Sequence, residues 1–369
     1  MTDRPYFHGR GELPKEKRQL PVVDPNRLCD GEGYLASGDL AAAVDVAIIL
    51  GMPLLLTGEP GSGKSRLADR VAAELHLLGP WEFPVKSETR GNDLFYAFDT
   101  VGRFHAANLA ANPRLADARN GPADIDPRRF VTFNALGRAI LQAKKPGYCT
   151  DVLRLPGSME VVKTHPGGQG ARAVVLIDEI DKAPRDVPND LLNEIESLSF
   201  RIPEFETADG GEVRVRLEED ELANRPLVII TSNSERALPE AFLRRCVFHH
   251  VGLPPFDRDR QEKGGDDPTV EDIVASRLLN IYPDKPALRQ DAVAFFRYLR
   301  SNAVHLSPPP SLAELLNWLE LLLLDKSPDR PLPKQADASI RRGLQATLFK
   351  TRDTQQQAKR LYQDWQEGR

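Results

Sequence analysis

A glycine-rich stretch of eight residues constrains the fold of this chain more than any other part of its sequence. It reads Gly58-Glu59-Pro60-Gly61-Ser62-Gly63-Lys64-Ser65 and fits the pattern G-x-x-x-x-G-K-[ST]. The stretch follows a short apolar run, Pro53–Thr57, and opens a segment with helical periodicity, Ser65–Leu78. Such a loop turns its backbone N–H groups toward phosphate oxygens, and the helix adds the positive end of its dipole. The pattern therefore predicts phosphate binding.

Two side chains of this loop have predicted roles in binding a nucleotide. Lys64 can reach the β- and γ-phosphates, and Ser65 can ligate Mg²⁺. The predicted nucleotide-binding residues are Gly58, Glu59, Pro60, Gly61, Ser62, Gly63, Lys64, Ser65 and Arg66. The competing interpretation is a glycine-rich turn that fits the pattern by chance, and the flanking strand and helix argue against it.

An acidic pair follows a second apolar run. Ala173–Ile177 predicts a buried strand and leads directly into Asp178 and Glu179. The carboxyl ends of parallel strands face the ligand crevice, where exposed carboxylates cost little free energy. We expect Asp178 to hold Mg²⁺ together with Ser65, and Glu179 to act as the general base for the attacking water. The alternative is a solvated turn with a helix N-cap, and Asp181 fits such a cap better than a metal ligand.

Strand-like and helix-like segments alternate along the chain up to about residue 255. Leu227–Thr231 and Val247–Val251 are further apolar runs of strand length. Their alternation with helical segments predicts a parallel α/β sheet flanked by helices. Phe200–Pro203 and Glu212–Val215 flank a pair of glycines, which predicts a β-hairpin inserted ahead of the strand at Leu227–Thr231.

The sequence divides into three predicted parts. Residues 1–35 are rich in proline, glycine and charge, and predict an extended N-terminal arm. Residues 36–255 predict the α/β domain, which includes a long irregular insert at 79–171. Residues 256–369 contain helical segments separated by prolines and predict an all-helical C-terminal lid.

Composition limits the classes of protein to which the chain can belong. It has 41% hydrophobic and 28% charged residues over 369 positions, which is ordinary for a soluble globular protein. A net charge of −5 argues against a protein whose whole surface binds nucleic acid, but it does not exclude a local basic channel. Cys29, Cys149 and Cys246 lie far apart, which predicts neither disulfides nor a zinc site. Together with the lack of a long apolar stretch, this predicts a cytoplasmic protein.

These motifs resemble those of AAA+ ATPases, and specifically the MoxR-like branch with an insert in the second helix. Leu227–Asn233 is similar to the family's strand that ends in a polar sensor residue beside the γ-phosphate. Leu238–Cys246 is similar to the helix that ends in the arginine finger. The resemblance covers residues 35–255 well and the C-terminal part loosely. It implies an AAA+ P-loop NTPase core with a helical lid, ATP and Mg²⁺ as ligands, and a hexameric ring with ATP at each subunit interface.

The resemblance also implies roles for residues beyond the two acidic ones. Asn233 would orient the attacking water, and Arg245, favoured over its neighbour Arg244, would stabilise the transition state in an adjacent subunit. The predicted catalytic residues are thus Glu179, Asn233, Arg245 and Arg244. Taken alone, Asn233 also fits a turn or cap, and the two arginines also fit a solvated helix end that suits the helix dipole.

One departure from the family concerns the lid. The family usually has a basic residue at the start of a lid helix, where it senses the nucleotide. The matching stretch here, Leu306–Glu314, contains neither arginine nor lysine, and His305 is the nearest candidate. The expected consequence is weak coupling between the lid and the γ-phosphate, or a different residue in this role.

The leading functional expectation is an ATP-driven, chaperone-like remodelling machine. The resemblance implies a protein client and a partner with a von Willebrand factor A domain. A nucleotide-dependent motor on nucleic acid, like restriction-type GTPases of related topology, stays open, although the acidic net charge argues against it. A scaffold that binds nucleotide without hydrolysing it also stays open, because the lid lacks the expected base.

Overall fold

The computed structural model describes residues 31–111, 125–166, 170–184, 187–206, 210–233, 238–256, 267–278, 281–282, 284–301, 306, 308–324, 328–333 and 338–368. The chain forms two compact units. The first comprises Leu40–Gly58 and Ala68–His250, and contains the predicted sheet. The second comprises Met1–Asp39, Glu59–Leu67 and Val251–Arg369, and therefore unites the glycine-rich loop with the C-terminal helices. The three-part division of the sequence stays a prediction. None of the described helices has the length and apolar character that crossing a membrane would require.

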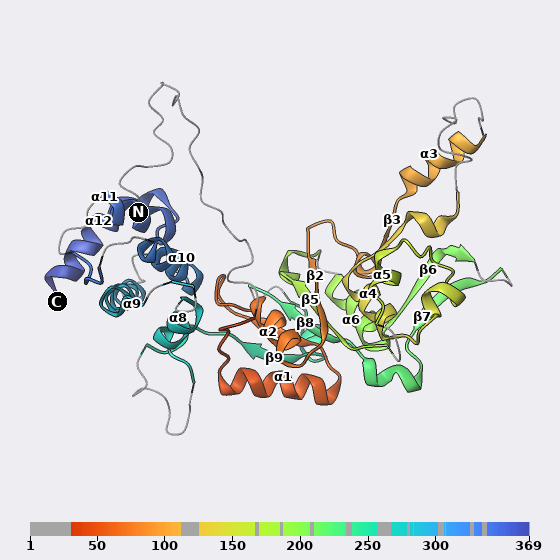
Figure 1. The fold of residues 1–369 in the computed structure, drawn as a ribbon, viewed down its shortest axis with the longest axis horizontal. Helices are drawn as coiled ribbons and strands as arrows, with labels where there is room; N and C mark the ends of the chain where they lie inside the picture. Colours follow the sequence, from red (N-terminus) through yellow and green to blue (C-terminus); the bar gives the residue numbers. More distant parts are fainter. Residues whose placement is uncertain are drawn as a thin grey trace. The chain divides into compact units, whose positions relative to one another are not determined.

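The first unit is built on a parallel five-stranded sheet with the strand order β2-β5-β8-β1-β9 (Figure 1). Its strands are Leu54–Thr57 (β1), Leu78–Pro84 (β2), Ala173–Asp178 (β5), Leu227–Thr231 (β8) and Val247–His250 (β9). Every neighbouring pair runs parallel. The central strands β1, β5 and β8 are buried almost throughout, because their apolar residues are covered on both faces. The predicted parallel α/β sheet is confirmed, including its strand at Val247.

Helices that alternate with these strands along the chain include Gly38–Leu50 (α1), Arg66–Glu74 (α2), Ala135–Ala143 (α4) and Val187–Ser197 (α6). Helix α4 packs on β2 and β5, and every residue of it except Arg138 is buried. Its Leu136 and Ile140 belong to the same apolar core as Val175 of β5. This packing fixes the position of β5, whose last residue is Asp178.

The helix after the glycine-rich loop is shorter than predicted. The periodicity of Ser65–Leu78 predicts one helix, yet α2 ends at Glu74 and Leu78 begins β2. The Leu77 N–H donates to the Ala72 carbonyl at 2.9 Å and the His76 N–H to the Ala73 carbonyl at 3.4 Å. His76 has a φ of 52°, so the helix stops in a left-handed turn that glycine normally supplies. Without a glycine there, the sequence gives no signal for the end of the helix.

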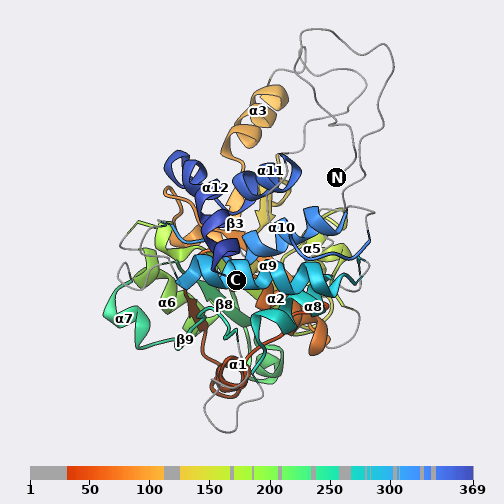
Figure 2. The ribbon, with the colours of Figure 1, turned by 90° about the vertical axis from the view of Figure 1, so that its left-hand side faces the viewer.

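The described residues of the insert between the loop and β5 form helices and strands, so the prediction of an irregular segment is wrong for them. It contains Thr100–Ala111 (α3), α4, Glu160–Lys163 (α5) and an antiparallel pair formed by Tyr96–Phe98 (β3) and Val131–Phe133 (β4). Helix α3 extends away from the sheet in both views (Figures 1 and 2). Short helical turns within the described residues lie at Gly91–Leu94, Pro127–Phe130, Tyr148–Val152, Ile180–Lys182 and Glu219–Asn224.

The predicted hairpin ahead of β8 is confirmed. Ser199–Glu206 (β6) pairs antiparallel with Glu212–Arg216 (β7). Phe200 of β6 stacks on Phe95, with ring centroids 4.9 Å apart, which joins the hairpin to the apolar core of the insert. A short helix, Glu240–Leu243 (α7), lies between β8 and β9.

The regular elements of the described C-terminal part are helices, as predicted (Figure 2). The helices are Val270–Leu278 (α8), Pro286–Ser301 (α9), Leu312–Leu323 (α10), Ala338–Thr347 (α11) and Arg352–Glu367 (α12). Phe295, Trp318 and Tyr362 meet in the core of this group, with the Phe295 and Tyr362 ring centroids 5.3 Å apart. Helices α11 and α12 are separate, because the Thr351 hydroxyl accepts from the Thr354 N–H and begins α12 anew.

Candidate functional site

The backbone conformation of the glycine-rich loop depends on its glycines. Gly58, Gly61 and Gly63 have φ values of 141°, 77° and 91°, in the region that other residues rarely adopt. Gly58 comes directly after the last residue of β1, Thr57, so the loop leaves the sheet at the carboxyl ends of its parallel strands. A side chain at any of these three positions would strain the loop.

Lys64 lies folded into this loop. Its side chain is buried, and its Nζ donates to the carbonyl oxygen of Glu59 at 2.9 Å. The helix that follows starts at once, since the Arg66 N–H bonds the Gly63 carbonyl at 3.1 Å and the Leu67 N–H bonds the Lys64 carbonyl at 3.2 Å. The ammonium group is therefore held beside the backbone of the loop and the N-terminus of α2, where an anion is favoured.

The ends of β5 and β8 bring predicted site residues together. The Thr231 hydroxyl donates to Oδ1 of Asp178 at 2.6 Å and accepts from the Glu179 N–H at 2.9 Å. Thr231 is buried, and Asp178 is half-buried at the strand end. One hydroxyl thus fixes both the Asp178 carboxylate and the backbone of the next residue. A fixed carboxylate at this edge is the kind of oxygen ligand that Mg²⁺ takes in phosphoryl-transfer sites.

The side chain of Glu179 is oriented by residues from two strands. Nδ2 of Asn233, just after β8, donates to its Oε1 at 3.3 Å, and Lys182 forms an ion pair with its other oxygen. The Asn233 N–H in turn donates to Oδ1 of Asp181 at 3.1 Å. Glu179 has a φ of 59°, so a non-glycine residue holds a strained left-handed backbone. Asp181 lies in the short helical turn after Glu179 and positions Asn233, a function that the sequence did not suggest.

The two candidate arginines lie at the end of α7. Arg244 forms an ion pair with Glu240, one turn earlier in the chain. Nε of Arg245 lies 3.5 Å from Oε1 of Glu196 on α6. Both arginines are exposed. The adjacent Cys246 is buried, and burial raises the pKa of its thiol to about 12, so it stays neutral and unreactive.

Comparison with known families decides the class of this domain. A family model described as the AAA domain of the dynein-related subfamily matches residues 53–246. The chain belongs to this AAA family. No curated protein matches it.

Two solved structures are reported as similar to the chain. The RuvB Holliday junction branch migration motor of Thermotoga maritima is 14% identical, with 84% of this chain and 67% of that chain covered and a TM-score of 0.36. NtrX from Brucella abortus is 15% identical, with 84% of this chain and 56% of that chain covered and a TM-score of 0.40.

Thr231 of the AAA domain is a site residue that the sequence analysis missed. The only signal was its place as the polar end of an apolar strand. Replacing Thr231 by valine keeps the shape but removes the donor to Asp178 and the acceptor for the Glu179 N–H. We expect the free energy of unfolding to fall by about 1–3 kcal/mol, measured by urea denaturation. Thr132→Val on the exposed face of β4 is the control and should change it by under ~0.5 kcal/mol. Equal effects of both variants would contradict this role for Thr231.

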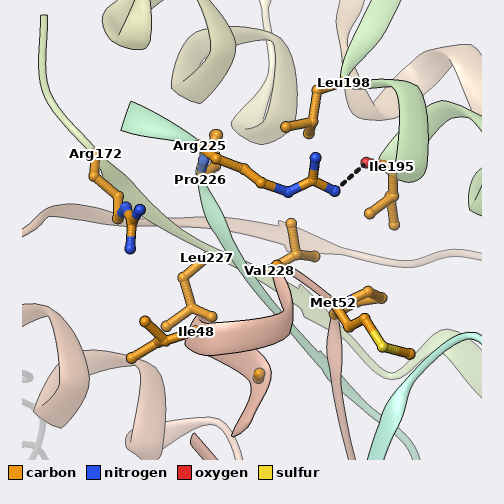
Figure 3. Close-up of a pocket in the computed structure, with 12 residues that line it drawn as sticks. Ile48, Met52, Arg172, Ile195, Leu198, Arg225, Pro226, Leu227 and Val228 are labelled. Atoms are coloured by element: carbon orange, nitrogen blue, oxygen red, sulfur yellow. Dashed lines mark hydrogen bonds between the residues drawn. The ribbon is translucent and has the colours of Figure 1, made fainter. Parts of the chain in front are cut away.

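The AAA domain also has a surface pocket, which is lined by other residues (Figure 3). It opens where β1 and β8 begin, whereas Asp178 and Thr231 are at the strands' carboxyl ends. The Arg225 side chain crosses it and donates to the Ile195 carbonyl at 3.5 Å (Figure 3). Burial lowers the pKa of this guanidinium. Its lining residues are Ala47, Ile48, Gly51, Met52, Pro53, Arg172, Ile195, Leu198, Arg225, Pro226, Leu227 and Val228. None of the predicted site residues is among them.

The lid residue suggested as a substitute sensor, His305, lies outside the described residues. The stretch that lacks the expected base is described at Leu306 and from Pro308 to Glu314. It forms the start of α10, where Ser311 and Glu314 make a capping box. The hydrogen bonds of this capping box stabilise the start of α10.

Proposed function

We propose that this AAA domain binds ATP with Mg²⁺ and hydrolyses it, and that the protein works as a hexameric remodelling ATPase of the MoxR-like type. The observation that carries the proposal is the arrangement of Asp178, Glu179 and Asn233 around Thr231 at the carboxyl ends of β5 and β8. The phosphate-binding motif leaves the same edge of the sheet after β1. These are the two elements that nucleoside triphosphate hydrolysis requires of a P-loop fold.

The residues present fit ATP and Mg²⁺. The left-handed glycines leave the loop backbone open to phosphates, Lys64 supplies a cation, and the Ser65 hydroxyl and Asp178 carboxylate supply oxygen ligands. Mg²⁺, when bound, would neutralise charge on the β- and γ-phosphates. We assign phosphate binding to Gly58–Ser65, with Arg66 in the first turn of α2, and the metal to Ser65 and Asp178.

In the proposed reaction, Glu179 accepts a proton from the water that attacks the γ-phosphate. Asn233 holds one oxygen of its carboxylate at 3.3 Å. Lys182 holds the other, and the hydrogen bond from this lysine to Glu179 raises the pKa of the lysine, so that it stays charged. Both contacts involve exposed or half-exposed groups, so water can reach the carboxylate. The left-handed backbone at Glu179 aims the side chain that the reaction needs.

Arg245 is proposed to act on ATP bound by a neighbouring subunit. Its side chain is exposed at the surface, where a second copy of the chain could reach it, and Nε lies 3.5 Å from Oε1 of Glu196. Arg244, paired with Glu240 within α7, is the second choice. The protein client and the von Willebrand factor A partner are part of the same proposal and rest on the resemblance alone.

Mixing variants tests the action of Arg245 in trans. Arg245→Ala should bind ATP normally but hydrolyse it at least ~10³-fold more slowly, because the transition-state charge loses its partner. Lys64→Ala alone should show little turnover at ATP concentrations near the wild-type Kd, because it binds ATP more weakly. In mixed rings, Lys64→Ala subunits supply Arg245 to neighbours that carry Arg245→Ala, so part of the turnover should return. Mixtures as inactive as the separate variants would contradict action in trans.

The general test of the proposal measures ATP turnover with and without Mg²⁺, while light scattering follows assembly. Mg²⁺-dependent turnover with ATP-dependent assembly into a hexamer is the expected result. Binding and assembly without turnover would favour the scaffold. Turnover that DNA strongly stimulates, and that protein clients do not, would favour the nucleic-acid motor. Absence of nucleotide binding would overturn the proposal.

A further inference from the structure

Helices α9 and α10 contact the glycine-rich loop directly, within one compact unit. The Ala313 N–H, in the first turn of α10, donates to the Gly61 carbonyl at 3.2 Å. A Cβ atom at Gly61 would lie 2.7 Å from the Ser311 hydroxyl and 3.2 Å from the Ala313 Cβ. No side chain fits between the loop and the start of α10. The loop that is proposed to bind phosphate is therefore packed against the lid at Gly61.

An ion pair joins the same loop to α9. Nη1 of Arg300 lies 2.9 Å from Oε2 of Glu59, and Nη2 lies 3.2 Å from Oε1, which makes a two-bond pair. Nη1 also donates to the Pro310 carbonyl at 3.3 Å, directly ahead of α10. The Arg300 side chain is 15% exposed and that of Glu59 is 55% exposed. Arg300 therefore has a fixed place where α9 ends and α10 begins, and it holds Glu59 from there.

Glu59 makes contact with two cations through different groups. Its carboxylate accepts from Arg300, and its backbone carbonyl accepts from Nζ of Lys64 at 2.9 Å. Fixing the side chain of Glu59 also fixes the peptide group whose oxygen holds Lys64. A simple surface ion pair would stabilise the fold slightly and do nothing more. Here the two parallel N–H···O bonds, the mostly buried guanidinium and the link through Glu59 to Lys64 argue for a specific role.

We propose that Arg300 is a positioning residue for nucleotide binding, which acts through Glu59 to hold the phosphate loop and Lys64 in place and to join them to the lid. This inference rests on the proposed function. Arg300 is thus a basic residue of the C-terminal helices that lies at the loop. The stretch Leu306–Glu314 contains no arginine or lysine. Arg300 belongs to the preceding helix, α9. The anion that it binds in this structure is the carboxylate of Glu59 in the loop.

The test is a double-mutant cycle in the full chain, with Glu59→Gln, Arg300→Gln and the double variant. We expect each single variant to bind ATP ~5-fold more weakly, and the double variant to bind no more weakly than either one. Arg300→Lys keeps the charge but not the two-bond geometry, and should recover part of the affinity. Arg360→Gln is the control, because Arg360 forms an exposed pair with Asp364 in α12 and should leave ATP affinity unchanged.

Amide hydrogen exchange without nucleotide is the second measurement. We expect faster exchange in peptides covering Glu59–Lys64 in both single variants and not in Arg360→Gln. Weaker ATP binding in Arg300→Gln but not in Glu59→Gln would mean that Arg300 acts on the nucleotide directly, and would overturn the inference. Unchanged affinity and exchange in both would overturn it as well. If the wild type binds no ATP but the exchange effect is present, the proposed function fails and the link between loop and lid stands.

Discussion

Lys64→Ala is expected to weaken ATP binding by about 10- to 100-fold while leaving the fold intact. In the structure the ammonium group is buried in the loop and bonded to the Glu59 carbonyl. Bound phosphate would replace this neutral carbonyl with a fully charged acceptor. A hydrogen bond to a charged group contributes roughly 1.5–3 kcal/mol, which corresponds to the expected loss of affinity. Titration with a fluorescent ATP analogue measures it.

Two controls separate loss of the ligand contact from damage to the loop. Lys163→Ala removes an exposed lysine at the end of α5 and should bind ATP as the wild type does. The melting temperature of Lys64→Ala without nucleotide should stay within a few degrees of the wild type, because the hydrogen bond from Lys64 to the neutral Glu59 carbonyl contributes only about 0.5–1.5 kcal/mol. Adding ATP should then raise the melting temperature of the wild type only. Full affinity in Lys64→Ala would refute phosphate binding by this loop.

The parts of the site that could be predicted from the sequence are those set by local pattern. Apolar runs of strand length predicted β1, β5 and β8, and the ends of β5 and β8 placed Asp178 and Asn233 at one edge of the sheet. The glycine positions of the loop follow from backbone geometry alone, and Gly58, Gly61 and Gly63 have the predicted freedom in φ. These features need no knowledge of distant contacts.

What could not be predicted depends on contacts between residues that are far apart in the chain. Thr231 bonds Asp178 across 53 positions, and Arg300 bonds Glu59 across 241. No periodicity or motif pairs such residues. The end of α2 was missed for a different reason, since His76 takes a left-handed turn that sequence rules assign to glycine. Ordered structure in the insert was missed because β3 and β4, of three residues each, are too short to show a pattern.

Glu179→Gln is expected to lower the rate of ATP hydrolysis by roughly 10²- to 10⁴-fold without weakening ATP binding, because glutamine cannot accept the proton of the attacking water. Glutamine has the same shape, and its oxygen can still accept from Nδ2 of Asn233. The exposed ion pair with Lys182 would be lost, at a cost of about 0–1 kcal/mol in stability. Steady-state turnover, together with ATP affinity measured on the same preparation, gives both quantities.

Lys182→Gln is the matched control for this variant. It breaks the same ion pair but keeps the Glu179 carboxylate and its bond from Asn233. If Glu179 is the base, Lys182→Gln should retain turnover within a few-fold of the wild type. If both variants lose turnover equally, the ion pair matters rather than the base, and Glu179 would serve to orient the turn at Ile180–Lys182. If neither variant loses turnover, the proton goes elsewhere, and the assignment of Glu179 is wrong. The control therefore separates a role in proton transfer from a structural role for the same side chain.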